Sequence, residues 1–207
     1  MKTRLAAAIG HDLAVEVYRA LTTAVMNSTT AVHSSERARV VCFWPQDAGA
    51  EIAAWLGGEV LEPQDGVDLG ARMDRAFANS FARGSTATVL IGTDSLGIDR
   101  LAVAAAFAAL DTADVVLRGA VDGGYTLIGL KRRQPSLFTD IAWSTDTVMA
   151  TALARASASG LRVAVHGHDA DIDTLDDLRR HWVQVRQYLD DDVARRIEGA
   201  AFSSPPA

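Results

Sequence analysis

The stretch that decides the fold is Thr86-Ala87-Thr88-Val89-Leu90-Ile91-Gly92-Thr93-Asp94-Ser95. It opens with a near-continuous apolar run, which is typical of a strand buried on both faces of a sheet. The run ends in a polar loop that carries a carboxylate and two hydroxyl groups. Open α/β sheets bind their ligands at the carboxyl ends of their strands. The stretch therefore predicts an α/β sheet with Asp94 at the ligand-binding edge.

Strand and helix patterns alternate on both sides of this stretch. Helical spacing of apolar residues, or alanine content, predicts helices over 10–26, 47–56, 69–81, 100–110, 145–158 and 174–188, the last continuing to residue 197. Runs rich in apolar and β-branched residues predict further strands over 39–43, 59–61, 114–117, 125–130 and 162–165. Such alternation predicts a three-layer α/β fold with a mostly parallel sheet. We expect one domain over 1–200 and a flexible tail over 201–207.

Composition narrows the classes of function. With 49% hydrophobic and 22% charged residues in a chain of 207, there is enough apolar surface to form a folded core. The net charge of −6 lacks the basic surface that nucleic-acid binding needs. Charged residues interrupt the early apolar runs and no run is long enough to span a bilayer, so we expect a cytoplasmic protein without membrane insertion. The single cysteine, Cys42, excludes an internal disulfide and indicates a buried small hydrophobe.

Asp94 and Asp122 each permit a functional and a structural interpretation. Asp94, beside Thr93 and Ser95, could hold a divalent cation that neutralises a diphosphate, or it could cap the next helix. The segment Asp122-Gly123-Gly124-Tyr125 follows a second apolar strand. Its aspartate could accept hydrogen bonds from sugar hydroxyls, whereas the paired glycines also suit a tight hairpin turn.

A third acidic segment contains Asp169, Asp171 and Asp173 at alternate positions, directly after a predicted strand. Three carboxylates so close in sequence cannot all point at one place without a cation or a division of roles. Asp173 and Thr174 also fit the start of a helix, where acidic and hydroxyl side chains satisfy free N–H groups. A metal site and a helix cap therefore both remain open for Asp173.

The amino-terminal residues Lys2, Thr3 and Arg4 form a cationic stretch ahead of the predicted helix over 10–26. Such a loop can hold phosphate groups, with lysine acting as a point charge and arginine bonding two oxygens, or it can be a frayed, solvated terminus. A dinucleotide oxidoreductase is disfavoured, because no Gly-x-Gly-x-x-Gly opens a helix after a strand.

Taken in order, these motifs resemble a bacterial family with a glycosyltransferase-A-like fold, the radical-SAM/selenodomain-associated transferases. That family is similar to 2-phospho-L-lactate guanylyltransferase and to the molybdenum-cofactor nucleotidyltransferases. The resemblance runs from Lys2 to about Leu178 and rests on six segments: Lys2-Thr3-Arg4-Leu5-Ala6, Asp68-Leu69-Gly70-Ala71-Arg72-Met73, Ile91-Gly92-Thr93-Asp94-Ser95, Asp122-Gly123-Gly124-Tyr125-Thr126-Leu127-Ile128-Gly129-Leu130, Leu137-Phe138 to Trp143-Ser144-Thr145, and Asp171-Ile172-Asp173-Thr174 to Asp177-Leu178.

The resemblance implies a nucleotide-diphospho-sugar transferase fold, GT-A-like and Rossmann-like, that uses Mg²⁺ or Mn²⁺ and binds a nucleotide or nucleotide sugar and a small acceptor. It implies glycosyl transfer, with a nucleotidyltransferase or a noncatalytic binding module as alternatives, and it is compatible with a homodimer. The implied metal ligands are Asp94 and Asp173, and the implied catalytic residues are Asp94 and Asp122. The implied substrate-binding residues are Lys2, Arg4, Thr93, Ser95, Gly123, Gly124, Tyr125, Trp143, Ser144 and Thr145.

Three departures from the family pattern stand out. Leu96-Gly97 follows Ser95 where the family has a proline, and Thr126 follows Tyr125 where the family doubles the tyrosine. Family members also begin with a hydrophobic strand and a glycine-containing loop, and this chain starts inside that loop. Two hypotheses account for this start. In one, a GTG valine codon serves as Met1 and the coding frame continues upstream; in the other, a short form closes the gap with neighbouring strands and loses catalysis.

Overall fold

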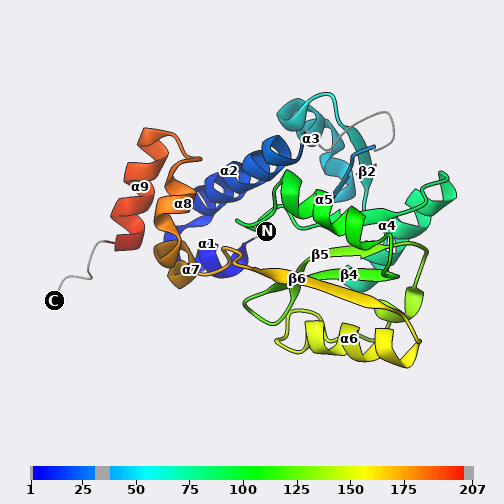
Figure 1. The fold of residues 1–207 in the computed structure, drawn as a ribbon. Coiled ribbons are helices and arrows are strands. Elements are labelled where there is room, and N and C mark those ends of the chain that lie inside the picture. Colours follow the sequence, from blue (N-terminus) through cyan, green and yellow to red (C-terminus); the bar gives the residue numbers. More distant parts are fainter. Residues whose placement is uncertain (1, 31–37, 203–207) are drawn as a thin grey trace.

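The computed structural model describes residues 2–30 and 38–202. Its larger sheet has four strands in the order β3-β5-β4-β6 (Figure 1). Their bounds are β3 Thr88–Ile91, β4 Val115–Ala120, β5 Tyr125–Leu130 and β6 Val163–Asp169. β4 and β6 are parallel, and β5 is antiparallel to both its neighbours, so β3, β4 and β6 all run the same way. The carboxyl ends of these three strands therefore lie at one edge of the sheet.

A second sheet contains β1 (Val40–Phe43) and β2 (Val60–Pro63), paired in parallel. Helix α3 (Gly49–Leu56) and a 3₁₀ turn over Gln46–Ala48 connect these two strands. The mixed α/β class predicted from the sequence is confirmed. The larger sheet is mixed rather than mostly parallel, because β5 runs against both its neighbours and two of the three pairings are antiparallel. The single sheet is not confirmed: within the described part of the chain, β1 pairs with β2 and β3 pairs with β5, and no ladder joins β1 to β3.

Helices cover both faces of the larger sheet. Successive side chains of a strand point to opposite faces, so neighbouring residues of β4 contact different helices. Val115 and Leu117 pack with α4 (Leu69–Ala82) and α6 (Val148–Ala158). Val116, between them, packs with α5 (Arg100–Ala109) on the other face. Figure 1 shows α5 and α6 on opposite sides of the sheet. The arrangement has the three layers that the alternation of elements predicts.

A second group of helices packs beside the sheet, on the left in Figure 1. Its members are α1 (Thr3–Ile9), α2 (His11–Thr29), α7 (Leu175–Arg180), α8 (Trp182–Arg186) and α9 (Asp191–Phe202). Their buried side chains form a core cluster of their own, which includes Leu5, Leu21, Leu178, Val185 and Ile197. None of the helices in the described residues combines the length and the apolar character needed to cross a bilayer.

The prediction of an amino-terminal loop was wrong. Thr3–Ile9 forms helix α1, and Lys2 is its N-cap residue. Leucine and alanine favour a helix here, and Leu5 and Ile9 lie four residues apart on the face that is buried in the helical cluster. Gly10, at φ 86°, separates α1 from α2.

The prediction of one long carboxyl-terminal helix over 174–197 was also wrong, because the segment forms three separate helices, α7, α8 and α9. A straight helix over this range would be about 36 Å long, and it could not return Leu178, Val185 and Ile197 to one cluster. The predicted tail begins too early, since Ala201 and Phe202 belong to α9. The rest of that tail, 203–207, lies outside the described residues.

Candidate functional site

Four carboxylates stand just beyond the carboxyl ends of the three parallel strands. Asp94 follows β3, Asp122 follows β4, and Asp171 and Asp173 follow β6. An isolated β-bridge between Ser95 and Asp171 joins the loop after β3 to the loop after β6. The topology therefore brings these acidic residues, distant in sequence, to one edge of the sheet.

Lys2 lies between two of these carboxylates. Its ammonium donates to Oδ2 of Asp94 and to Oδ1 of Asp173, each at 3.1 Å. The Lys2 side chain is only 3% exposed, against 37% for Asp94 and 32% for Asp173. Arg4 donates to the other oxygen of Asp173 at 2.7 Å from the exposed side. Asp94 and Asp173 are thus oriented toward one cationic atom, and a second cation stands beside it.

Other residues provide the helix caps that were the structural alternatives for these aspartates. Asp99 caps α5 by accepting from the backbone N–H groups of Leu101 and Ala102. Thr174 caps α7 in a capping box with Asp177. Asp94 and Asp173 are therefore not the cap residues of the helices that follow them, so the capping interpretation of these two aspartates was wrong, whereas the expected start of a helix at Thr174 is confirmed.

Asp171 is the residue at this edge that the sequence interpretation did not assign to the site. Burial, together with the negative charges of Asp122, Asp173 and Asp94, raises the pKa of Asp171 to about 6. Asp171 therefore lies within electrostatic reach of the other three carboxylates. The alternation of Asp169, Asp171 and Asp173 was the sequence signal that could have identified it, because alternate positions after a strand share a face.

The three aspartates of that alternation have different roles. Asp169 is 5% exposed and pairs with Arg118, which bonds both of its oxygens. Thr126 also donates to Asp169, at 3.1 Å, so one buried carboxylate connects β4, β5 and β6. A side chain at Gly97 would collide with this carboxylate, which explains a glycine there. Asp169 therefore holds the strands together, while Asp171 and Asp173 face the acidic edge.

Asp122 lies in the hairpin turn between β4 and β5, as the paired glycines suggested. Its Oδ1 accepts from the backbone N–H of Gly124 at 3.0 Å, and the residue is exposed. Gly123 has φ 90°, and a side chain there would collide with the backbone of Asp146. The turn thus fixes the position of an exposed carboxylate at the edge of the site, so the turn and the ligand-facing interpretation are compatible.

The remaining predicted contact residues differ in their surroundings. Thr93 accepts a hydrogen bond from Thr22 of α2 at 3.4 Å, and Ser95 is buried. The Tyr125 ring packs edge-on against Trp143 at 6.4 Å between centroids, and burial raises the pKa of its phenol. Both rings face the core cluster beneath the sheet.

The segment after Trp143 packs near the Asp122 turn. Ser144 and Thr145 are exposed, and the backbone N–H of Met149 donates to the Gly123 carbonyl at 2.9 Å. The buried indole N–H of Trp143 has no hydrogen-bond partner among the residues that the structure describes. The assignment of Trp143, Ser144 and Thr145 to the acceptor side stays a prediction.

Asp94 and Asp173 suit a hard divalent cation, because both direct an oxygen at one point. Mg²⁺ is commonly held by one or two carboxylates together with water and phosphate oxygens. Among residues 2–30 and 38–202, no three His, Cys, Asp or Glu side chains are placed to enclose a metal ion unaided. A cation at this pair would therefore need further ligands, such as phosphate oxygens and water.

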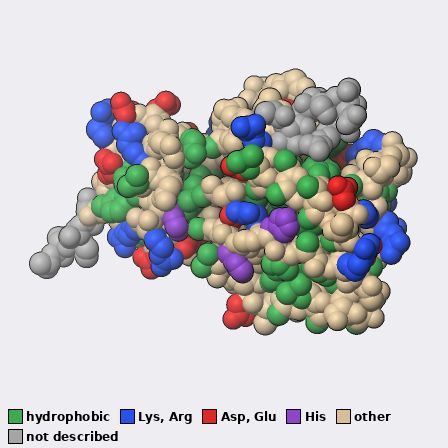
Figure 2. All heavy atoms as spheres, in the orientation of Figure 1, with side chains coloured by type: hydrophobic (Ala, Val, Ile, Leu, Met, Phe, Trp, Pro, Cys, Tyr) green, Lys and Arg blue, Asp and Glu red, His purple; other side chains and the backbone are tan. Residues whose placement is uncertain are grey.

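The lack of a three-residue ligand cluster among the described residues also bears on the histidines of β6. His166 and His168 lie on this edge strand, and Figure 2 shows histidine side chains beside a basic side chain on the face where β6 lies. A soft-metal site normally needs more nitrogen or sulfur ligands than two imidazoles. The described residues supply no such third ligand, so these histidines carry no metal assignment.

The fold is shared with solved structures. The chain is similar to a protein of Desulfovibrio desulfuricans G20 described as a "putative nucleotide-diphospho-sugar transferase", with a TM-score of 0.79 and 28% identity over 92% of this chain and 93% of that chain. A homologue of Mycobacterium tuberculosis Rv0371c from Mycobacterium sp. strain JC1 has a TM-score of 0.51 and 20% identity over 82% and 83%, a likeness of fold alone. No curated protein matches the chain. The chain therefore has the mixed α/β fold of nucleotide-diphospho-sugar transferases.

Its family follows from the sequence match. Residues 26–145, more than half of the chain, match the family described as "Uncharacterized protein conserved in bacteria (DUF2064)". The chain belongs to this family. The finer resemblance to the radical-SAM-associated transferases and the guanylyltransferases stays a prediction.

Proposed function

We propose that this protein is a transferase that binds a nucleotide sugar with a divalent cation and transfers the glycosyl group to a small acceptor. One observation carries the proposal: Asp94 and Asp173, from loops after different parallel strands, both bond the buried Lys2 ammonium. Two carboxylates oriented toward one positive charge at the ligand-binding edge form the protein side of a cation–diphosphate site. The fold likeness to a nucleotide-diphospho-sugar transferase supports the same class.

In this proposal, Asp94 and Asp173 hold Mg²⁺ or Mn²⁺, which would neutralise the diphosphate of the donor. Lys2 and Arg4 face the phosphate oxygens. Arg4 can bond two oxygens at once, whereas Lys2 contributes a compact charge from a buried position. These cations stabilise the negative charge that develops on the departing nucleoside diphosphate.

Asp122 is assigned to the acceptor side. It is exposed at the rim, and the backbone N–H of Gly124 fixes its orientation. An acceptor hydroxyl would attack the anomeric carbon, the bond from that carbon to the diphosphate oxygen would break, and Asp122 would take the hydroxyl proton. The nucleoside diphosphate leaves with the electron pair of the broken bond.

The test is calorimetry of the full chain with uridine, guanosine, cytidine and adenosine diphosphates, each with and without Mn²⁺. We expect Mn²⁺-dependent binding of at least one, and at least about tenfold weaker binding by Asp94→Asn, since about 1.4 kcal/mol corresponds to a factor of ten. Asp111→Asn is the matched control, because Asp111 is exposed and lies just before β4, at the opposite edge of the sheet.

Equal binding by Asp94→Asn and the parent would remove the assigned role of Asp94. The absence of Mn²⁺-dependent binding to any of the four would leave only a noncatalytic module. Product analysis separates the two chemistries. Release of a nucleoside diphosphate from a nucleotide sugar supports glycosyl transfer, and release of pyrophosphate from a nucleoside triphosphate would replace it with nucleotidyl transfer.

A further inference from the structure

Two departures from the transferase pattern that the sequence resembles meet at one carboxylate, that of Asp169. Leu96-Gly97 stands where that pattern has a proline, and Thr126 stands where it has a second tyrosine. Thr126 donates to Oδ2 of Asp169 at 3.1 Å. A Cβ atom on Gly97 would lie 1.8 Å from Oδ1 of Asp169, so the Gly97 backbone rests directly against the same carboxylate. Asp169 therefore links two positions at which this chain differs from the pattern.

The Asp169 carboxylate is itself held in a fixed orientation. Arg118 donates to both of its oxygens, with Nη2 of Arg118 2.7 Å from Oδ1. An arginine that bonds both oxygens fixes the plane of a carboxylate as well as its position. Arg118 also lies at the register shift in both ladders that β4 makes, and such bulges re-aim side chains beside functional sites.

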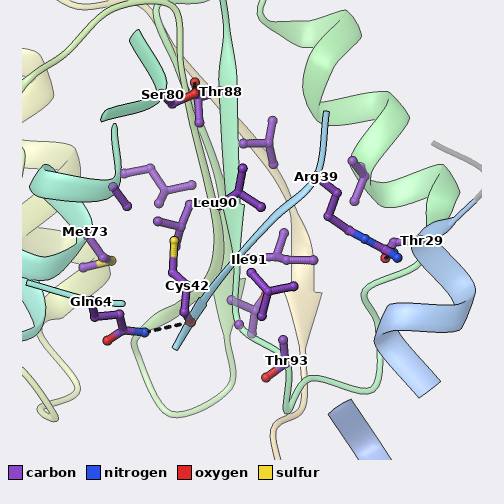
Figure 3. Close-up of a pocket in the computed structure, with 18 of the residues that line it drawn as sticks. Thr29, Arg39, Cys42, Gln64, Met73, Ser80, Thr88, Leu90, Ile91 and Thr93 are labelled. Atoms are coloured by element: carbon purple, nitrogen blue, oxygen red, sulfur yellow. Dashed lines mark hydrogen bonds between the residues drawn. The ribbon is translucent and has the colours of Figure 1, made fainter. Parts of the chain in front are cut away.

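The two acidic loops run antiparallel next to this carboxylate. β3, which Figure 3 shows from Thr88 to Thr93 along one side of a cavity, leads into the loop of Asp94. Successive residues of this loop meet successive residues of the loop after β6, in the pairs Ser95–Asp171, Leu96–Ala170 and Gly97–Asp169. A slip of one residue between the loops would move Asp94 by about 3.3 Å relative to Asp173 and turn its side chain to the other face.

We propose that Asp169, oriented by Arg118, is a positioning residue that fixes the register of the two acidic loops and thereby the separation of Asp94 and Asp173. Its role toward a cation rests on the proposed function. The register itself has a consequence that needs no cation, because Lys2 bonds one carboxylate from each loop. Arg118 neutralises Asp169, so this pair adds no net charge to the acidic edge.

The shielding of Lys2 reports the register without a metal. Lys2 and Lys131 are the two lysines of the chain, so peptide mass spectrometry can follow the acetylation rate of Lys2 relative to Lys131. The test variant is Gly97→Ala, which adds one methyl group against the Asp169 carboxylate. Gly199→Ala is the matched control, since a Cβ atom there meets nothing within 4 Å in the described part of the chain. Neither glycine has a left-handed φ, so neither alanine strains the backbone.

We expect Gly97→Ala to raise the relative Lys2 rate about tenfold, through easier local opening of the loops. Gly199→Ala should react like the parent. Asp169→Ala should also raise the Lys2 rate, and it provides the test if Gly97→Ala does not fold. Adding Gly97→Ala to Asp169→Ala should have no further effect, because the methyl group then has room.

Two results would overturn the positioning role. One is a Lys2 rate in folded Gly97→Ala or Asp169→Ala equal to that of the parent, even if urea unfolding shows lower stability, because a purely structural role changes stability alone. The other is an effect of Gly97→Ala that is equally large with and without the Asp169 carboxylate.

Mn²⁺-dependent nucleotide binding separates this inference from the proposed function. We expect Gly97→Ala to weaken the binding seen in the parent about tenfold. If the parent shows no such binding, the proposed function fails, and the Lys2 rates alone support or overturn the role of Asp169. If the parent and Gly97→Ala bind equally well, the proposed function stands and the positioning role is refuted.

Discussion

Lys2 connects parts of the chain that are far apart in sequence, since its two partners lie 92 and 171 residues away. Its charge is buried while both carboxylates remain about one-third exposed. A buried ammonium is stable only with such partners, because desolvation of an unpaired charge is costly. The same contact makes Asp94 and Asp173 depend on Lys2 for their neutralisation.

Lys2→Ala should therefore destabilise the protein by about 1.5–3 kcal/mol, the range for hydrogen bonds to charged groups. Urea unfolding in the presence of a chelator measures this change. Mn²⁺ should then raise the Tm of the variant more than that of the parent, because two carboxylates without the ammonium attract a cation more strongly. Lys131→Ala is the control, since Lys131 is partly exposed and donates to a backbone carbonyl. An equal Mn²⁺ effect in variant and parent would contradict this role.

Asp171 gives the site a pH dependence. Its pKa of about 6 in the folded protein lies above its ordinary value of 3.8, so the folded state holds the proton more tightly than the unfolded state. Stability is lost as the pH rises from about 4 to about 6, and the loss is constant above that. Asp171→Asn removes the charge. The free energy of unfolding of this variant minus that of the parent should therefore be about 1–2 kcal/mol greater at pH 7.5 than at pH 4. Urea unfolding at the two pH values, with a chelator present, checks this, and a difference that does not change with pH would refute it.

The sequence could place these aspartates at strand ends, but it could not decide whether they cap the helices that follow them. That decision depended on Asp99 and Thr174, whose side chains reach the free N–H groups of α5 and α7. The burial of Lys2 also could not be predicted, because its partners come from two distant loops. Local pattern contains no information on such long-range contacts.

Among the elements, α7 shows how a short helix holds a site residue. Asp173 directly precedes its N-cap residue Thr174, and the side chains of Thr174 and Asp177 satisfy each other's backbone N–H groups. This capping box fixes the backbone at the point where Asp173 turns toward Lys2 and Arg4.

Thr174→Ala should reduce the free energy of unfolding by about 1 kcal/mol, the usual value of an N-cap side chain. Thr147 provides a matched control, because it occupies the N-cap position of α6 and makes no side-chain capping bond. In urea unfolding, Thr147→Ala should lose less free energy of unfolding than Thr174→Ala does. If both variants lose the same free energy, the cap of α7 does not have the assigned importance.

Strands and helices with strong local patterns could be predicted, and the two ends of the chain could not. β5 has the predicted bounds, and α4 extends one residue past its predicted end. β4 and β6 continue beyond their predicted ends through Arg118 and His168, because pairing in the sheet overrides the weak propensity of these polar stretches. At the ends of the chain, packing into the helical cluster decides the structure.

At the scale of the whole molecule, the two sheets differ in burial. β4 and β5 are almost wholly buried, whereas β1 and β2 are mostly half-buried or exposed and form a pair of four-residue strands. A two-stranded sheet is marginally stable unless it packs against further structure. The molecule therefore has a rigid part around β5 and a less stable part around β1.

Native-state hydrogen exchange should show this division. We expect backbone amides of β1 and β2 to exchange at least about tenfold faster than those of β4 and β5, which corresponds to local opening that costs about 1.4 kcal/mol less. Exchange measured residue by residue at one pH, with intrinsic rates removed, provides the test. Equal protection of the two sheets would show that they unfold as one unit.

The burial of Lys2 has a practical consequence for work with this protein. An affinity tag fused directly ahead of Met1 would begin beside the residue that joins Asp94 to Asp173. Helix α9, in contrast, lies on the outer side of the helical group (Figure 1), and its last residue, Phe202, is 43% exposed. Purification handles and surface-immobilisation linkers therefore belong at the carboxyl terminus, where they leave the acidic edge open to solvent.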